Sequence, residues 1–416
     1  MRHLFVLFLF CFTFGKILGQ ENIIKSLTLK EAIEIGIKNH PDIKAAQSNI
    51  IASKGRYWSG ISLPQPEFVY DNQFISANKG LGNERTLSIS QSFEFPSIYF
   101  LKGKKFSKGE EMSIIQLRLI EKNLISKIKS AYYKILAKQN QLKSAQENLI
   151  ITEDFLKKSE IRLNVGEGTN IEKMTAKVQF SEAQNYLEIT KNELKTSFAE
   201  LNFVLGFDNQ TDELNYKLQD TLNFVDYSLN KENYLKLIEE NNPQIKIAEL
   251  NCEIATVDKS LAKSTYMPKV NLAYLSQTLD NQSGFHGITV GVSVPLWFMF
   301  EQSGKVQEAN ANQSISENVL QLTKNDVVLK LKSSKTDYEN NLKQVKLYLN
   351  DILPQSEEIF RTASKSFEVG ELTYLEYLQA KQTLINSRNN YNTALLNYYQ
   401  SIFRIEEIVG QNLINK

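Results

Sequence analysis

The chain has 416 residues, 42% of them hydrophobic and 23% charged, with a formal net charge of +1 at pH 7. This balance is typical of a folded protein with a sizeable core and excludes a disordered chain. The near-zero charge, without any lysine and arginine run that resembles a phosphate-binding stripe, argues against a nucleic-acid-binding function.

Residues 1–19 have the pattern of a secretory signal peptide. A basic start at Arg2 is followed by an apolar run from Leu4 to Phe14, and the small Gly19 closes the segment. The apolar run is about eleven residues long, against the roughly 20 that span a bilayer, so a membrane anchor is the weaker interpretation. We therefore expect an exported protein, in which Cys252 would be the one cysteine left after cleavage.

The rest of the chain is a tandem duplication with an offset of about 200 residues. Three motifs of the first half return in the second: NHPDIK at 39–44 as NNPQIK at 241–246, VGEGT at 165–169 as VGELT at 369–373, and Leu205-Gly206 as Val409-Gly410. The predicted division is a first repeat at 20–206, a linker or equatorial segment at 207–230 and a second repeat at 231–416.

Each repeat has the same predicted order of elements, α-β-β-α-α. It begins with a helix whose first turn carries Pro41 or Pro243, where a missing N–H costs nothing, and the capping residue is His40 or Asn39 in one repeat and Asn242 in the other. Two alternating segments follow, then a long helix, a glycine-containing turn and a final helix. The four strands are expected at about 66–75, 86–95, 268–279 and 287–296.

The long helical stretches carry a 3.5-residue hydrophobic spacing, which is typical of coiled coils. One heptad register runs from Ile114 to Leu156, and similar stepping runs from Tyr338 to Ala363. A helix from about residue 101 to 165 would be on the order of 95 Å long, and no compact globule needs such a helix. On periodicity alone, a fibrous coiled coil or a helical bundle is the simplest interpretation.

The expected strands have one apolar and one polar face. In LSISQSFEF, residues 87–95, apolar or amide side chains alternate with serine or glutamate. A half-buried strand of a soluble sandwich alternates in the same way. However, the segments form hairpins of roughly the 9–11 residues that a transmembrane strand requires, and aromatic residues suited to a membrane interface follow each hairpin. These are Tyr99, Phe100, Trp297 and Phe298.

Four strands cannot close a membrane barrel, because the smallest such barrels use about eight and an open edge in lipid leaves backbone groups unpaired. Several copies must therefore share one barrel. Three copies would supply twelve strands, and their long helices would continue the cylinder as an α-barrel of coiled coils. The predicted fold class is mainly α with a membrane β-barrel.

Together these features resemble the TolC family of outer-membrane efflux channels, also called outer membrane factors. The most specific likeness lies in the two hairpin turns with the helices that follow them, VGEGTNIEKMTAKVQF and VGELTYLEYLQAKQTL, and in the Asn-x-Pro helix starts. The likeness covers nearly the whole chain after the signal peptide.

The resemblance implies a homotrimeric conduit in the outer membrane of a Gram-negative bacterium, with a long periplasmic part. Its partners would be outer-membrane lipid, a periplasmic adaptor (membrane fusion) protein and, through the adaptor, an inner-membrane pump of the RND or ABC type. It would export small molecules, drugs or metal ions. A conduit for secreted proteins or peptides is the alternative within the channel class, and a periplasmic coiled-coil scaffold without a pore is the alternative outside it.

The resemblance also assigns functional residues. The two tip turns that would contact the adaptor are Gly166, Glu167, Gly168, Thr169, Gly370, Glu371, Leu372 and Thr373. A plainer interpretation is that Gly166 and Gly370 supply a positive φ at helix ends. Glu376 would line the tunnel entrance in an acidic ring, with Gln379 where a second acid is expected, and the alternative is a solvated Glu376.

No pattern indicates catalysis. The histidines are His3, His40 and His286, of which His3 lies in the predicted signal peptide. Without a histidine pair, a glycine-rich phosphate motif or carboxylates paired in a recognisable motif, we expect no enzyme, no metal site and no cofactor.

Overall fold

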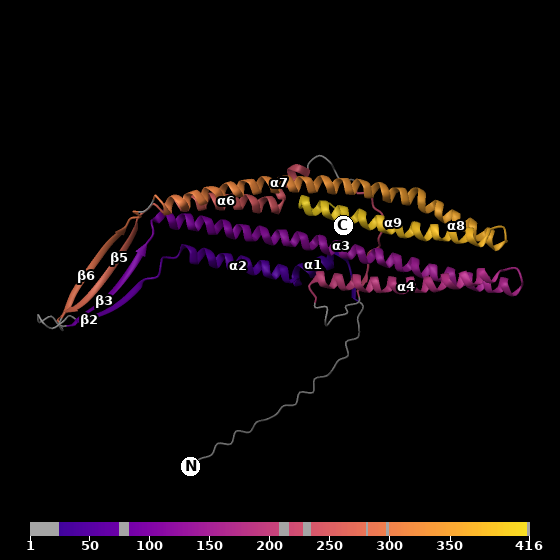
Figure 1. The fold of residues 1–416 in the computed structure, drawn as a ribbon, viewed down its shortest axis with the longest axis horizontal. Coiled ribbons are helices and arrows are strands. Elements are labelled where there is room, and N and C mark those ends of the chain that lie inside the picture. Colours follow the sequence, from indigo (N-terminus) through magenta and orange to yellow (C-terminus); the bar gives the residue numbers. More distant parts are fainter. Residues whose placement is uncertain are drawn as a thin grey trace, which may run out of the picture.

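The computed structural model describes residues 25–74, 83–207, 216–227, 234–279, 282–296 and 299–413. The molecule is elongated, with a sheet at one end, a layer of long helices through the middle and two helical hairpin turns at the other end (Figure 1). The predicted signal peptide and the aromatic residues Trp297 and Phe298 lie outside the described residues. Within the described residues, no helix combines the length and the apolar character that a membrane crossing requires.

The tandem repeat is confirmed by the order of elements. The first repeat contains α1 (Leu29–Asn39), α2 (Pro41–Ile61), β2 (Glu67–Phe74), β3 (Asn83–Phe93), α3 (Pro96–Asn164) and α4 (Asn170–Leu205). The second contains α5 (Tyr234–Asn241), α6 (Pro243–Ser264), β5 (Lys269–Leu279), β6 (Gln282–Ser293), α7 (Glu301–Leu347), α8 (Leu353–Glu368) and α9 (Tyr374–Val409). A short parallel pair, β1 (Lys25–Leu27) and β4 (Tyr216–Leu218), lies at mid-height.

Two elements differ from the expected order. A short helix, α1 or α5, precedes the proline-initiated helix of each repeat. The start of α1 has a readable signal, because Thr28 and Glu31 form a capping box in which each side chain accepts from the other residue's backbone N–H. Two strands begin earlier than expected: β3 begins at Asn83 rather than near residue 86, and β6 begins at Gln282 rather than near residue 287, because Leu279 already pairs with Gln282.

The second long helix is not continuous. Between α7 and α8 the chain makes a π-helical turn at Tyr348–Ile352, just before Pro354. Proline has no N–H to donate, and a wider turn accommodates the missing hydrogen bond. The heptad stepping expected from Tyr338 to Ala363 is therefore interrupted in its middle.

The sheet joins the two repeats. Its order is β2-β3-β5-β6, and each neighbouring pair is antiparallel. Next to the sheet the helices follow the same order, since α3 packs between α2 and α6, and α6 packs on α7. Toward the far end α3 packs on α4 and α9, and α9 packs on α8. One wall therefore runs from the sheet to the hairpin turns.

The repeated motifs contact each other at mid-height. Gly206, at φ +81°, ends α4 against the backbone of His40, so close that a Cβ there would lie 2.8 Å from the His40 Cα. In the second repeat Gly410, also at φ +81°, ends α9 against the carbonyl of Asn241. The Asn242 side chain caps α6 and donates to the carbonyl of Ile408 at 2.9 Å. Each Asn-x-Pro start is therefore packed on the glycine that closes its own repeat.

The main core surrounds the segment between the repeats. Tyrosine hydroxyls from the long helices hold this segment: Tyr132 donates to Asp220 at 2.7 Å, Tyr398 to the carbonyl of Val225 at 3.0 Å, and Tyr399 to the carbonyl of Asn223 at 2.6 Å. Burial raises the pKa of all three tyrosines, so they remain protonated donors.

Candidate functional site: a two-faced sheet and two helical tips

The four-stranded sheet has one apolar and one polar face. Directly paired residues of neighbouring strands share a face, and the register aligns Phe68 with Ile89, Ile89 with Tyr274 and Tyr274 with Ile288. The exposed side chains of this apolar face are Phe68, Tyr70, Leu87, Ile89, Val270, Leu272, Tyr274, Ile288, Val290 and Val292. An apolar surface this continuous is typical of contact with lipid or a partner rather than with water.

The opposite face is mostly polar and small. It aligns Ser90 with Glu67 and Ala273, Ser92 with Asn271, and Asn271 with Gly291. Its apolar members include Val69, Ala273, Leu275 and Phe285, the last of which pairs with Gln277. Within the described residues, β2 and β6 each pair on one side only, so the sheet presents two open edges.

The predicted interface aromatics behave differently from one another. Phe100, in the first turns of α3, is 75% exposed. Tyr99 is half-buried, and its hydroxyl accepts a hydrogen bond from the backbone N–H of Glu94 at 3.1 Å. Tyr99 therefore fixes the junction between strand and helix, and Phe100 alone of the two presents its ring to the surroundings.

The first tip turn joins α3 to α4. Gly166 has φ +79°, and the backbone N–H of Glu167 donates to the carbonyl of Arg162 at 2.9 Å. Thr169 then caps α4 in a capping box with Glu172. The positive φ at this position therefore favours glycine. Glu167 and Thr169 are exposed at the end of the molecule.

The second tip turn, between α8 and α9, has the same construction. Gly370 has φ +77°, and the N–H of Glu371 donates to the carbonyl of Ser366 at 2.9 Å. Thr373 caps α9 in a capping box with Glu376. Leu372 is half-buried, because it packs on the cluster described next.

An aromatic cluster, here called the tip cluster, joins the two hairpins. Phe155 of α3 stacks on Tyr374 and Tyr377 of α9, with ring centroids 4.8 and 5.5 Å apart, and Phe367 of α8 stacks on Tyr377 at 5.0 Å. Two ionic links add to it. Lys158 pairs with Glu368 at 3.2 Å, and Arg388 pairs with Glu147 at 2.7 Å and with Glu357 at 3.2 Å. This cluster could not be predicted from the sequence, because its members come from segments that are far apart in the chain.

Glu376 has a local role that the sequence pattern Thr-x-x-Glu could have indicated. Its carboxylate accepts from the backbone N–H of Thr373 at 3.0 Å and from the Thr373 hydroxyl at 2.6 Å. These hydrogen bonds hold the pKa of Glu376 below its usual value. Glu376 and Gln379 are both exposed and line the same hollow between α8 and α9.

The histidines and the cysteine, whose side chains could titrate or bind a metal ion, make structural contacts instead. His40 caps α2, accepting from the N–H of Asp42 at 3.2 Å, and His286 lies 2.9 Å from the Tyr274 hydroxyl. Cys252 on α6 is half-buried, and burial raises the pKa of its thiol. Among the described residues, no three His, Cys, Asp or Glu side chains gather as metal ligands would.

Comparison with known proteins agrees with this architecture. Residues 234–411 match the family described as outer membrane efflux protein (OEP). The cobalt-zinc-cadmium resistance protein CzcC of Cupriavidus metallidurans is 20% identical over 392 residues, which cover 92% of this chain and 90% of CzcC. The outer membrane protein TolC of Vibrio cholerae serotype O1 is 21% identical over 309 residues, covering 71% of this chain and 69% of TolC. The solved outer-membrane channel OprN shares the fold, with a TM-score of 0.81 at 14% identity over 92% of this chain and 90% of OprN.

Proposed function

We propose that this protein is the exit duct of a tripartite efflux system. Residues 234–411 match the outer membrane efflux protein family, and 92% of the chain shares the fold of the channel OprN. As a homotrimer this protein would carry small molecules from a periplasmic pump complex to the exterior. The observation that carries the proposal is the two-faced sheet with two open edges, continued by one wall of long helices that ends in two exposed turns.

The open edges support the trimer. In lipid an unpaired strand edge costs several kcal/mol per unsatisfied group, so β2 of one copy must pair with β6 of the next. The helical wall has exposed apolar side chains along both of its sides. On the side of α2 and α4 these are Ile51, Trp58, Ile171, Met174 and Val178, and on the side of α7 and α8 they are Leu322, Leu329 and Ile359. Three copies closing in this way give a twelve-stranded barrel with its apolar face toward lipid.

The two tips support docking on a periplasmic adaptor. They lie at the end of the molecule farthest from the sheet (Figure 1), and both present a glutamate beside a glycine at positive φ. Two like turns at neighbouring positions offer a repeated surface for helical hairpins of a partner. Through the adaptor the duct would connect to an inner-membrane pump of the RND or ABC type, which drives transport.

The entrance is assigned to Glu376 and, one turn further, Gln379. Both are exposed near the second tip, and the lowered pKa of Glu376 keeps its charge at neutral pH. Three copies of this carboxylate around a narrow opening would concentrate cations and repel anions.

The cargo class is small molecules, either drugs or metal ions. The relative named for cobalt, zinc and cadmium resistance supports metal ions as one candidate. A type I conduit for proteins or peptides is the competing function on the same scaffold, and a scaffold without a pore is the competing function outside the channel class.

Deletion of the chain in its own host tests this function. We expect the deletion strain to accumulate a fluorescent dye or to lose resistance to zinc, cobalt or cadmium, and the wild-type chain to restore export. The Gly55→Ala variant, altered in the exposed interior of α2, should restore export as well. Normal tolerance to both classes, together with loss of a protein from the culture medium, would favour the secretion conduit instead.

A further inference from the structure

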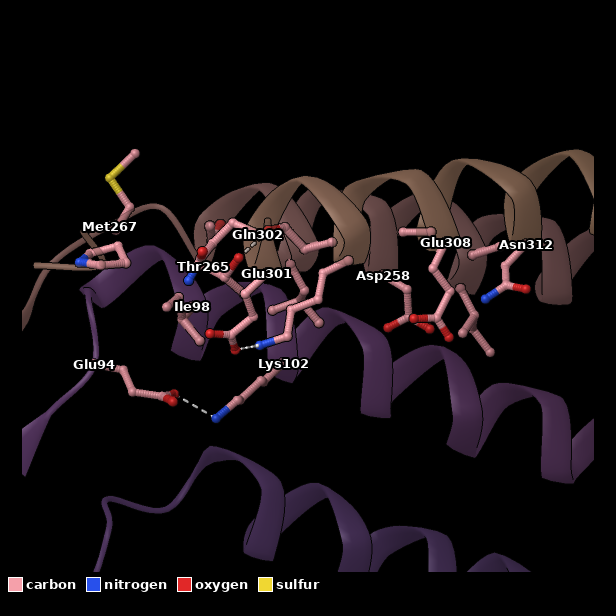
Figure 2. Close-up of a pocket in the computed structure, with 18 of the residues that line it drawn as sticks. Glu94, Ile98, Lys102, Asp258, Thr265, Met267, Glu301, Gln302, Glu308 and Asn312 are labelled. Carbon is pink, nitrogen blue, oxygen red and sulfur yellow. Dashed lines mark hydrogen bonds and ion pairs between the residues drawn. The ribbon is translucent and has the colours of Figure 1, made fainter. Parts of the chain in front are cut away.

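A groove of about 1060 Å³ lies where the sheet meets the helices. Its walls come from the start of α3, from α6 and from the first turns of α7 (Figure 2). The groove opens on the polar side of the sheet, since Lys269 and Ser293 pair on that face and both line it. In the trimer proposed above, this side faces the inside of the conduit.

The groove is lined by apolar and charged side chains, and the apolar part of the lining is here called the floor. The floor includes Ile254, Leu261, Ala309, Ile315 and Val319. Three acids on the walls are neutralised by lysines: Glu94 by Lys102 at 2.6 Å, Asp258 by Lys105 at 2.6 Å, and Glu301 by Lys305 at 2.5 Å. An apolar floor of this size suits the body of an organic molecule rather than a bare ion.

Glu308 is the acid in the groove that has no cation paired with it among the described residues. Glu308 on α7 and Asp258 on α6 both line the groove, and Figure 2 shows both side chains directed into it. Because Lys105 neutralises Asp258, the negative charge of Glu308 is the one in the groove without a neutralising lysine among the described residues. Lys269, which also has no described ionic partner, stands at the sheet end of the groove, whereas Glu308 lies two turns into α7.

Gln302 provides a second, independent indication of a ligand. Its side chain lines the groove and is only 7% exposed, yet its Oε1 has no hydrogen-bond donor among the described residues. A buried carbonyl oxygen without a donor is costly and is rare in folded proteins. A ligand with an N–H group would satisfy it.

We propose that this groove binds an amphiphilic organic cation, whose apolar body lies on the floor and whose charged amine contacts Glu308 while an N–H group reaches Gln302. The acceptors at both positions select a donor, and the uncompensated carboxylate selects a positive charge. That the groove lies on the export route depends on the proposed function, whereas the binding itself does not.

The test is equilibrium binding of rhodamine 6G, a cationic dye with N–H donors, to the purified protein in lipid nanodiscs, followed by fluorescence anisotropy. We expect Glu308→Gln to raise the Kd about tenfold, as the loss of one charge-assisted contact does, and Gln302→Leu to raise it several-fold. The matched control is Glu317→Gln, which removes the same charge from the same helix outside the groove and should leave the Kd unchanged.

Anionic fluorescein serves as the second probe and should bind at least tenfold more weakly than rhodamine 6G. An equal Kd for wild type and Glu308→Gln, or an equal affinity for the two dyes, would overturn the proposal. If Glu308→Gln raises the Kd for rhodamine 6G but the protein forms no pore, the binding groove is supported and the proposed conduit is refuted. A conducting pore with a Kd indifferent to Glu308 would refute the groove alone.

Discussion

At the scale of single residues, the capping boxes of the two tips allow a structural role of a glutamate to be distinguished from a role in the channel. Thr169 with Glu172 and Thr373 with Glu376 form the same capping box, so Glu172→Ala and Glu376→Ala should each lower the stability by a similar, small amount. Only Glu376→Ala should also lower the cation preference of the channel. Thermal unfolding and ion-selectivity measurements on both variants check this, and equal selectivity in the two would remove Glu376 from the entrance.

The charge of Glu376 should persist in mild acid. Its pKa is lowered in the folded protein, so the stabilisation that it gives is present above the unfolded pKa and is lost as the pH falls through the lower folded value. Cation selectivity should therefore stay constant from pH 7 to about pH 5, above the ordinary range of a glutamate. A selectivity that declines between these pH values would mean that another group titrates at the entrance.

A buried ion pair fixes the end of the chain. Lys129 and Glu406 lie 2.6 Å apart with side chains 8% and 6% exposed, and Glu406 also accepts from the backbone N–H of Leu413 at 2.7 Å. Lys129→Met leaves a buried carboxylate without its cation and should destabilise the protein by about 3–5 kcal/mol. The double variant Lys129→Met, Glu406→Leu should recover part of this loss in thermal unfolding. If the single and double variants unfold alike, the pair is not coupled.

At the scale of elements, each repeat is closed by a glycine at positive φ, Gly206 or Gly410. In Gly206→Ala the new Cβ meets the backbone of His40 at 2.8 Å and the residue must hold φ +81°, so we expect a loss of at least about 2 kcal/mol. Gly55→Ala, in the interior of α2 with open space around it, should be neutral or stabilising by up to about 1 kcal/mol. Denaturation midpoints compare the two, and similar midpoints would refute the packing of α4 on the start of α2.

The tip cluster should hold the two hairpins together. Phe155 is 4% exposed and contacts three aromatic rings, so Phe155→Ala should cost about 3–5 kcal/mol, concentrated at the tips. Hydrogen exchange should then accelerate near the ends of α3, α4, α8 and α9 and stay unchanged in the sheet. Uniform acceleration along the whole molecule would contradict a local role.

The elements differ in how far the sequence predicts them. Alternation and heptad spacing are local patterns, so the hairpins and the long helix α3 could be expected from the residues themselves. The helix α1 could also have been found, because Thr28 and Glu31 stand at capping-box spacing. The contact of Lys129 with Glu406 and the stacking of Phe155 on Tyr374 could not, since nothing local marks residues more than 200 positions apart as neighbours.

At the scale of the whole molecule, the repeat explains the architecture. Two copies of one unit place two hairpins side by side in a sheet whose faces match, and they place two like turns at the opposite end. The sequence predicts this arrangement because the motifs recur in the same order. It does not predict the groove at Glu308 and Gln302, because that groove forms only when α3, α6 and α7 meet beneath the sheet.

The central claim is that this chain forms a pore, and single-channel recording of the purified mature protein in a planar bilayer tests it most directly. We predict discrete, cation-preferring openings from a trimer, with larger or more frequent openings in Phe155→Ala, where the tip cluster is loosened. Phe155→Ala is recorded as well because a wild-type channel that is closed at rest would give no openings of its own. Silence from both proteins, in a chain that stays monomeric and soluble without detergent, would contradict the account and leave a periplasmic scaffold.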